Sequence, residues 1–200
     1  MEKMSINIGN YSSNKLYPSA LFLYGTFKDD GSPNFGMFCW FNYCYDKDLT
    51  IMACIGGNKL TKDQIKVNKV FSANLVTEPL LPLADYLANT NGYTDGKMDI
   101  PIEIEQGVVL PIPVLKNSPW VYELEISQSI PLIGSDLFIC KIRNILIAKN
   151  LIDNSKSEEE HIKTFTPVLW FGSGKYYSTN PAILGNTGDW KSTYKKNPIV

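Results

Sequence analysis

The sequence has little of what enzyme active sites are usually built from. Its only histidine, His161, lies in the charged stretch SKSEEEHIK, and no Gly-x-Ser-x-Gly motif occurs. No two carboxylates stand at a spacing typical of acid–base catalysis. These absences exclude a self-sufficient nucleophilic or acid–base enzyme, so any catalysis would depend on a cofactor.

A metal site and a disulfide framework are also poorly supported. The four cysteines, Cys39, Cys44, Cys54 and Cys140, include no Cys-x-x-Cys pair. With one histidine they do not make the ligand set that zinc requires. Three of the four lie in apolar, strand-like runs, where a free buried thiol is the commoner state, so we expect reduced cysteines.

The chain has no excess of positive charge and no long apolar run. Its 19 Lys and Arg against 20 Asp and Glu give a formal net charge of −1, which argues against a nucleic acid partner. No apolar run approaches the roughly 20 residues of a membrane span. The start, MEKMSINIGNYSSN, has no apolar core like that of a signal peptide, so we expect a cytoplasmic protein without membrane contact.

Two hundred residues suit one domain, and strand-like runs fill most of the chain. Residues 21–27 (LFLYGTF) and 34–43 flank an Asp30-Gly31 turn, which predicts a β-hairpin. Further β-rich runs follow, and these cover residues 49–55, 70–76, 108–115, 120–130 and 136–149. Outside this core we expect an N-terminal extension (1–16), a solvated loop or short surface helix (153–163) and a C-terminal tail (178–200).

Two short helices interrupt the strands. The first is expected to begin at Thr61, because Thr61 and Gln64 have the spacing of a capping box. The second follows Pro79 and ends at Asn89-Thr90-Asn91-Gly92. Several strands with two short helices and no regular βαβ alternation predict a mainly β fold, a β-barrel with helical decoration.

The segment Cys54–Thr61 (CIGGNKLT) could hold a phosphate. It runs from a strand through two glycines and Lys59 into a helix start. The first turn of a helix offers unpaired N–H groups and partial positive charge, and a lysine adds a full charge. Two glycines before a helix are also an ordinary turn, and Lys59 could simply be solvated, so both interpretations stay open.

The run Phe38–Phe41 (FCWF) could hold a planar ligand. Successive side chains of a strand point to opposite faces, so one aromatic set can lie in the core while the other faces a cleft. Aromatic strands are usually only barrel core, and by itself this run favours that alternative.

The order of these motifs resembles the flavin reductase-like, FMN-binding split-barrel family, which includes the flavoredoxins. The resemblance runs from about Tyr17 to at least Lys149. It rests on four stretches, YPSALFLYGTFKDDGSPNFGMFCWF, IMACIGGNKLTKDQIKVNKVFSANLVTE, LADYLANTNGYTDGKMD and PWVYELEISQSIPLIGSDLFICKIRNI. It implies a Greek-key split barrel and a homodimer with two FMN sites between its subunits.

The resemblance also implies which residues contact the cofactor. Lys59 and Thr61, with the backbone near Asn58, would hold the phosphate. Ring and ribityl contacts would come from Cys39, Trp40, Phe41, Cys54, Ile55 and Gly56. Lys97 would approach the ring, with an exposed loop lysine as the alternative, and Asn74 could instead be structural.

The implied activity is that of an NAD(P)H-dependent flavin reductase. NADH or NADPH would pass a hydride to FMN, and the electrons would go on to an unidentified acceptor. Two alternatives remain open: a flavin-binding electron carrier without NAD(P)H activity, and a ligand-free barrel that serves as an interaction module.

Overall fold

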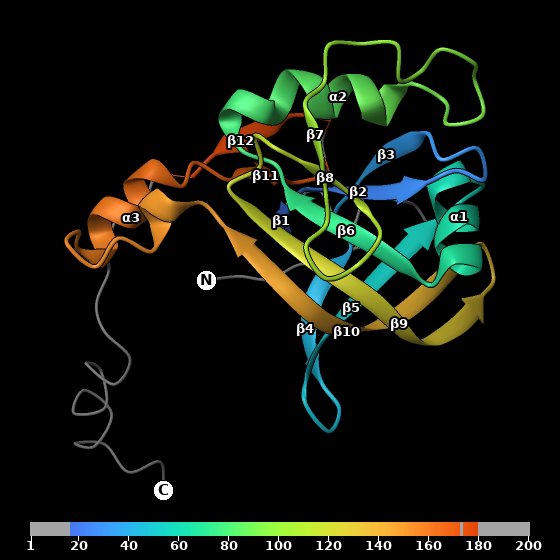
Figure 1. The fold of residues 1–200 in the computed structure, drawn as a ribbon, viewed down its shortest axis with the longest axis horizontal. Helices are drawn as coiled ribbons and strands as arrows, with labels where there is room; N and C mark the ends of the chain where they lie inside the picture. Colours follow the sequence, from blue (N-terminus) through green and yellow to red (C-terminus); the bar gives the residue numbers. More distant parts are fainter. Residues whose placement is uncertain (1–16, 173, 180–200) are drawn as a thin grey trace, which may run out of the picture.

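The computed structural model describes residues 17–172 and 174–179 and has a curled antiparallel sheet at its centre (Figure 1). The predicted extension 1–16 and residues 180–200 of the predicted tail lie outside the described part. Seven strands form the sheet in the order β3-β2-β6-β9-β10-β5-β4. They are β2 (Phe22–Phe27), β3 (Pro33–Phe38), β4 (Phe41–Tyr45), β5 (Leu49–Gly56), β6 (Val70–Leu75), β9 (Trp120–Leu132) and β10 (Ser135–Ile147).

The predicted β2–β3 hairpin is confirmed. Gly31 has a φ of +79°, the left-handed conformation that glycine adopts without strain. Asp30 Oδ1 accepts hydrogen bonds from both the amide and the hydroxyl of Ser32. This turn sets the register in which Phe27 faces Pro33.

The predicted strand 34–43 is in fact two strands. It breaks at Cys39 and Trp40, after which β4 leaves β3 and pairs with β5. Because β3 and β4 are the two edges of the sheet and only these two residues join them, the sheet must curl until its edges approach. A hydrogen bond of 2.9 Å from the Cys54 amide to the Trp40 carbonyl ties the connection to β5.

Alternation along β2 divides the core into two parts. Phe22 and Tyr24 point to one face of the strand and join the cluster that also contains Phe71 and Phe138. Leu23 points to the other face and packs in a second cluster under α2. The sheet therefore has a buried apolar layer on both faces, and Figure 1 shows α2 lying across one of them.

The helices are close to those predicted, but the predicted cap is wrong. Helix α1 (Leu60–Asn68) begins one residue earlier than expected, and no side chain caps it. The hydroxyl oxygen of Thr61 instead accepts a hydrogen bond of 3.0 Å from the buried Asn34 amide. A tertiary partner thus replaces the local one; η2 (Glu78–Leu80) and α2 (Leu81–Asn89) follow as expected.

The remaining elements agree only in part with the prediction. Of residues 108–115, only β8 (Pro113–Leu115) is a strand, paired with β7 (Ile104–Gln106). For residues 153–163 the alternative of a short helix holds in the second half, where α3 (Glu158–Thr164) follows η3 (Lys149–Leu151). The sequence patterns also missed a small sheet of β1 (Ser19–Ala20), β11 (Val168–Trp170) and β12 (Tyr176–Ser178), whose strands are too short to show periodicity.

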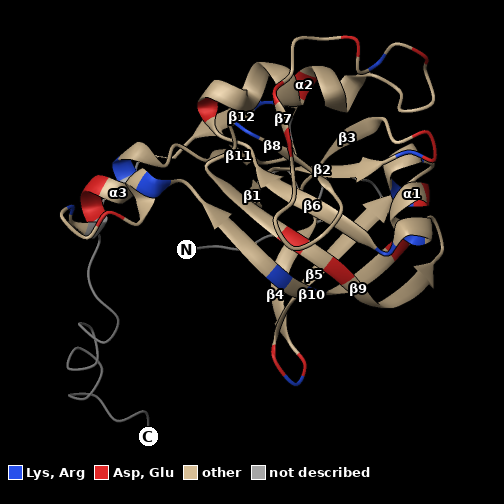
Figure 2. Cartoon of the chain, viewed as in Figure 1, with Lys and Arg blue, Asp and Glu red and all other residues tan. Residues whose placement is uncertain are grey.

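Most charged residues lie outside the strands of the sheet. Figure 2 shows them on α3, on α1 and at the tip of the β4–β5 hairpin, with most of the strands uncoloured. All four cysteines are free. Among the described residues, no group of three or more metal-ligating side chains comes together, and no helix is both long and apolar enough to cross a membrane.

Glu123 on β9 is a fully buried carboxylate. It accepts hydrogen bonds of 2.7–2.9 Å from the amides of residues 108–110 and one from Asn144. Burial alone would raise the pKa of Glu123, but these donors outweigh it and hold the pKa below its usual range. The loop that was expected to be a strand is therefore wrapped around this carboxylate.

We expect Glu123→Gln to destabilise the fold by about 2–4 kcal/mol, because the new amide group faces backbone donors and leaves them unpaired. Urea unfolding measures this loss. Glu125→Gln is the matched control on the same strand. It removes an ion pair with Arg143 whose two side chains are about half exposed, so it should cost less than about 1 kcal/mol. Equal losses in the two variants would contradict the role given to Glu123.

Candidate functional site

Two neighbouring cavities lie beside the break between β3 and β4. The first, about 250 Å³, is lined by Asn58, Lys59, Thr61 and Lys97, together with the end of α2. The second, about 460 Å³, is lined by predicted ring residues and by the β9–β10 turn. They share Met37, Phe38 and Lys59, so they form two ends of one cleft.

Lys59 stands where the two ends of the cleft meet. It is the N-cap of α1, with extended backbone, and its side chain has no hydrogen bond or ion pair with any described residue. The amides of the first helical turn after it lack intrahelical partners. Gly57 before it has a φ of +69°, and this turn brings β5 into the helix start.

Thr61 is buried, and its neighbours decide how its hydroxyl is used. The hydroxyl oxygen accepts from Asn34 Nδ2, which leaves its proton free to donate into the cavity that Thr61 lines. The helix start lies so close to β3 that a Cβ at Gly36 would stand 2.8 Å from Thr61 Oγ1. Glycine at position 36 is thus required for this approach.

Lys97 is not an exposed loop lysine. Its side chain is buried, and its ammonium donates a 2.7 Å hydrogen bond to the Phe35 carbonyl. Burial, and next the charges of Lys59 and Lys28, lower the pKa of Lys97 to about 8. The structure places Lys97 beside Lys59 and Thr61, at the opposite end of the cleft from Cys39 and Trp40.

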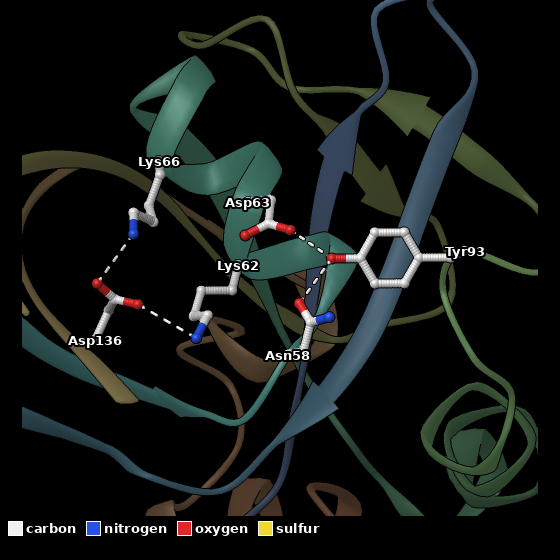
Figure 3. Close-up of polar contacts among 6 residues, drawn as sticks. All are labelled: Asn58, Lys62, Asp63, Lys66, Tyr93 and Asp136. Atoms are coloured by element: carbon white, nitrogen blue, oxygen red, sulfur yellow. Dashed lines mark hydrogen bonds and ion pairs between the residues drawn. The ribbon is translucent and has the colours of Figure 1, made fainter. Parts of the chain in front are cut away.

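The first cavity has an excess of positive charge, which favours an anion. Two ammonium groups line it, and none of its described lining residues is a carboxylate. The other two lysines of this region, Lys62 and Lys66, are paired with Asp136 at 3.3 and 3.2 Å (Figure 3). These ion pairs leave Lys59 and Lys97 as the uncompensated charges of the cleft.

The second cavity is lined largely by apolar and aromatic side chains. Cys39, Trp40, Cys54 and Gly56 line it, and the exposed fraction of Trp40 is 47%. A Cβ at position 56 would lie 3.2 Å from the Trp40 ring, so glycine lets the indole lie along β5. Burial raises the pKa of the Cys39 thiol to about 11, so this thiol is protonated at neutral pH and is not a nucleophile.

Two predicted ring residues take no direct part in this cavity. Ile55 is fully buried in the barrel core and lines neither end of the cleft. Phe41 packs against Phe22 at a ring distance of 4.1 Å and lines only an adjacent cavity of about 500 Å³ behind Trp40. Asn74 supports the structural alternative, since it bridges the Leu23 carbonyl and the Leu115 amide.

The motif search missed a residue at the rim of the first cavity. Tyr93, in the loop after α2, donates its hydroxyl proton to Asp63, and its hydroxyl oxygen lies 3.1 Å from Asn58 Oδ1 (Figure 3). The preceding residues of the loop, 90–92, line the cavity itself. Nothing local signals this contact, because it joins residues about 30 positions apart.

Comparisons with known proteins agree with the barrel. A family model described as "Flavin reductase like domain" matches residues 14–179. No curated protein matches the chain.

Solved structures confirm the predicted split-barrel fold. Flavoredoxin of Desulfovibrio vulgaris (Miyazaki F) is similar with a TM-score of 0.79 at 20% identity, over 93% of this chain and 99% of that one. Flavoredoxin from Methanosarcina acetivorans has a TM-score of 0.80 at 17% identity, over 96% and 100%. An FMN-binding protein from Thermus thermophilus with bound p-hydroxybenzaldehyde has a TM-score of 0.71 at 18% identity, over 93% and 98%.

We expect Lys97 to lose its proton near pH 8, against 10.5 for an ordinary lysine, which NMR of its side chain measures directly. Lys59→Ala should raise this pKa, because it removes a repelling charge, whereas Lys116→Ala on the β8 side should not. The folded-state pKa lies below the unfolded one, so the unfolded chain binds more protons between them. Stability should therefore rise with pH through this window, and a flat profile would contradict the burial of a charged Lys97.

Proposed function

The chain belongs to the flavin reductase like domain family, and from this premise we propose that it binds FMN in the cleft and accepts a hydride from NADH or NADPH. The observation that carries the proposal is the first cavity, which has two uncompensated ammonium groups, a helix start and no lining carboxylate. Such a site favours an anion with more than one negative charge, as a terminal phosphate is.

The residues of the cleft fit FMN in their order. Lys59, Thr61 and Lys97 would hold the phosphate, with Asn58 beside them. From there the cleft leads past Met37 and Phe38, which line both cavities. It reaches the apolar end at Cys39, Trp40, Cys54 and Gly56, where a flat ring system would lie. Gly36 and Gly56 line the two ends of the cleft, and the lack of a side chain at each lets Thr61 and Trp40 pack against them.

FMN would supply the redox chemistry, and the chain would supply binding, orientation and exclusion of water. Lys59 and Lys97 would neutralise the phosphate, and the Thr61 hydroxyl, oriented by Asn34, would donate to it. The protonated Cys39 thiol offers no competing nucleophile beside the ring. No described residue of the cleft needs to act as an acid or base, which agrees with the absence of a catalytic dyad.

We also propose a homodimer, with each cleft completed by the partner subunit. Large apolar side chains are exposed at Trp40, which lines the ring end of the cleft, and along the β4–β5 hairpin that follows it. They are Trp40, Tyr43, Tyr45, Leu49 and Met52. A second copy that covers them would also shield the ring from water. The chain itself would be one domain, since one sheet collects strands from residues 22 to 147; sedimentation equilibrium would separate dimer from monomer.

We predict that Lys59→Ala weakens FMN binding by about 1–3 kcal/mol, the range for loss of a charge-assisted contact. Quenching of flavin fluorescence in a titration measures the affinity. Riboflavin, which lacks the phosphate, should bind the variant and the native protein equally. Lys149→Ala, at an exposed residue of η3, is the control and should change neither affinity. Unchanged FMN affinity in Lys59→Ala would remove this lysine from the site.

The reductase activity has its own test. The FMN-loaded protein, mixed with NADH or NADPH without oxygen, should lose its yellow absorbance as the flavin is reduced. Reduction by dithionite is the control that the bound flavin is redox-active. If dithionite bleaches the protein and neither nicotinamide does, the chain is a flavin-binding electron carrier. A colourless protein that takes up no added FMN would instead support the interaction module.

A further inference from the structure

We propose that Tyr93 closes the phosphate end of the cleft and makes the site selective for FMN over FAD. The inference rests on the proposed function, because it concerns the same cavity. Beyond the binding of FMN, a closed phosphate end would explain why the bound flavin should end in a phosphate monoester. The chemical distinction is simple: the phosphate of FMN is terminal, whereas the diphosphate of FAD continues into adenosine.

The side chain of Tyr93 joins two elements that border the cavity. Its hydroxyl contacts Asn58, just before α1, and Asp63, on the first turn of α1 (Figure 3). Tyr93 itself comes from the loop between α2 and β7, whose residues 90–92 line the cavity. The contact therefore fastens the loop to the helix start, across the end where the phosphate would lie.

Close packing next to Tyr93 tightens this closure. A Cβ at Gly92 would lie only 2.8 Å from Leu60 Cβ, so the loop backbone rests directly on the first residue of α1. Farther along the loop, the Tyr86 hydroxyl donates to the Lys97 carbonyl at 3.2 Å. The loop is thus attached at both ends of the segment that walls the cavity, by α1 on one side and α2 on the other.

The phenol of Tyr93 is a stable donor in this position. The hydrogen bond to Asp63, and next the slight burial and charge around it, raise the pKa of Tyr93 above that of an ordinary tyrosine. It therefore keeps its proton at neutral and mildly alkaline pH. Asp63 does not line the cavity, so its carboxylate is engaged by Tyr93 without facing a bound phosphate.

Charge balance favours the same ligand. A phosphate monoester carries close to two negative charges on one group at neutral pH, and two ammonium groups face it. FAD spreads its charge over two phosphates, and its adenosine would have to pass between Tyr93 and α1. Entry of FAD would break the hydrogen bonds of Tyr93, whereas FMN can bind with them intact.

Dissociation constants for FMN, FAD and riboflavin, measured on the full chain by flavin fluorescence, test this inference. The native protein should bind FMN at least about tenfold more tightly than FAD. Tyr93→Phe keeps the ring but loses its hydrogen bonds, so it should reduce this ratio about tenfold, the effect of one charge-assisted bond. Tyr177→Phe removes the same hydroxyl at an exposed site on β12 and should leave the ratio unchanged.

Asp63→Ala is the second variant, which releases Tyr93 from the opposite side. The loss of the Asp63 charge affects the binding of FMN and FAD alike, because both are anions. The ratio of their affinities therefore reports on the closure by Tyr93 alone, and it should also fall in this variant. Circular dichroism verifies that each variant is folded. A ratio that stays the same in both folded variants, or a native protein that binds FMN and FAD equally, overturns the selectivity proposed for Tyr93. Failure of the native protein to bind any flavin, riboflavin included, would overturn the proposed function instead.

Discussion

The whole arrangement depends on how the sheet closes. Strands β3 and β4 form its two edges, yet only Cys39 and Trp40 lie between them in the chain. A sheet with such a connection cannot stay flat, and curling brings the end of β3 next to β5. Helix α1 starts directly after β5, so the seam of the barrel, the glycine turn and the helix start meet at one place. The cleft is the consequence of this closure.

Electrostatics then divides the cleft into two ends. Several lysines approach the start of α1, but Asp136 pairs with two of them and leaves Lys59 and Lys97 without an acidic partner among the described residues. The cost of burying Lys97 is visible in its lowered pKa. A fold that keeps a buried, repelled ammonium in a cavity gains most when an anion binds there. The apolar end at Trp40 has no comparable charge, which fits a ligand that is charged at one end and flat at the other.

Local patterns predicted much of the barrel because they act over few residues. The Asp30-Gly31 turn, the strand-like run of residues 21–27 and the glycines before α1 each have a local physical cause, and each appears in the structure. The failures have a common origin in distant contacts. Thr61 does not cap its helix because Asn34 binds it, and residues 108–110 are not a strand because Glu123 binds their amides. The residues next to Lys97 do not show whether it is exposed, because its burial depends on a hydrogen bond to the distant Phe35 carbonyl.

The sequence alone thus determined the mainly β fold and the family resemblance, and it predicts the segment from Cys54 to Thr61 as a place for a phosphate. Periodicity, turn chemistry and the order of motifs are written in neighbouring residues, so they can be read without coordinates. The tertiary structure decided which predicted side chains share a cavity, that Ile55 lies in the core, and that Lys97 and Tyr93 reach the helix start. Those outcomes depend on how the sheet curls and on which distant groups are desolvated together, and no stretch of chain encodes either by itself.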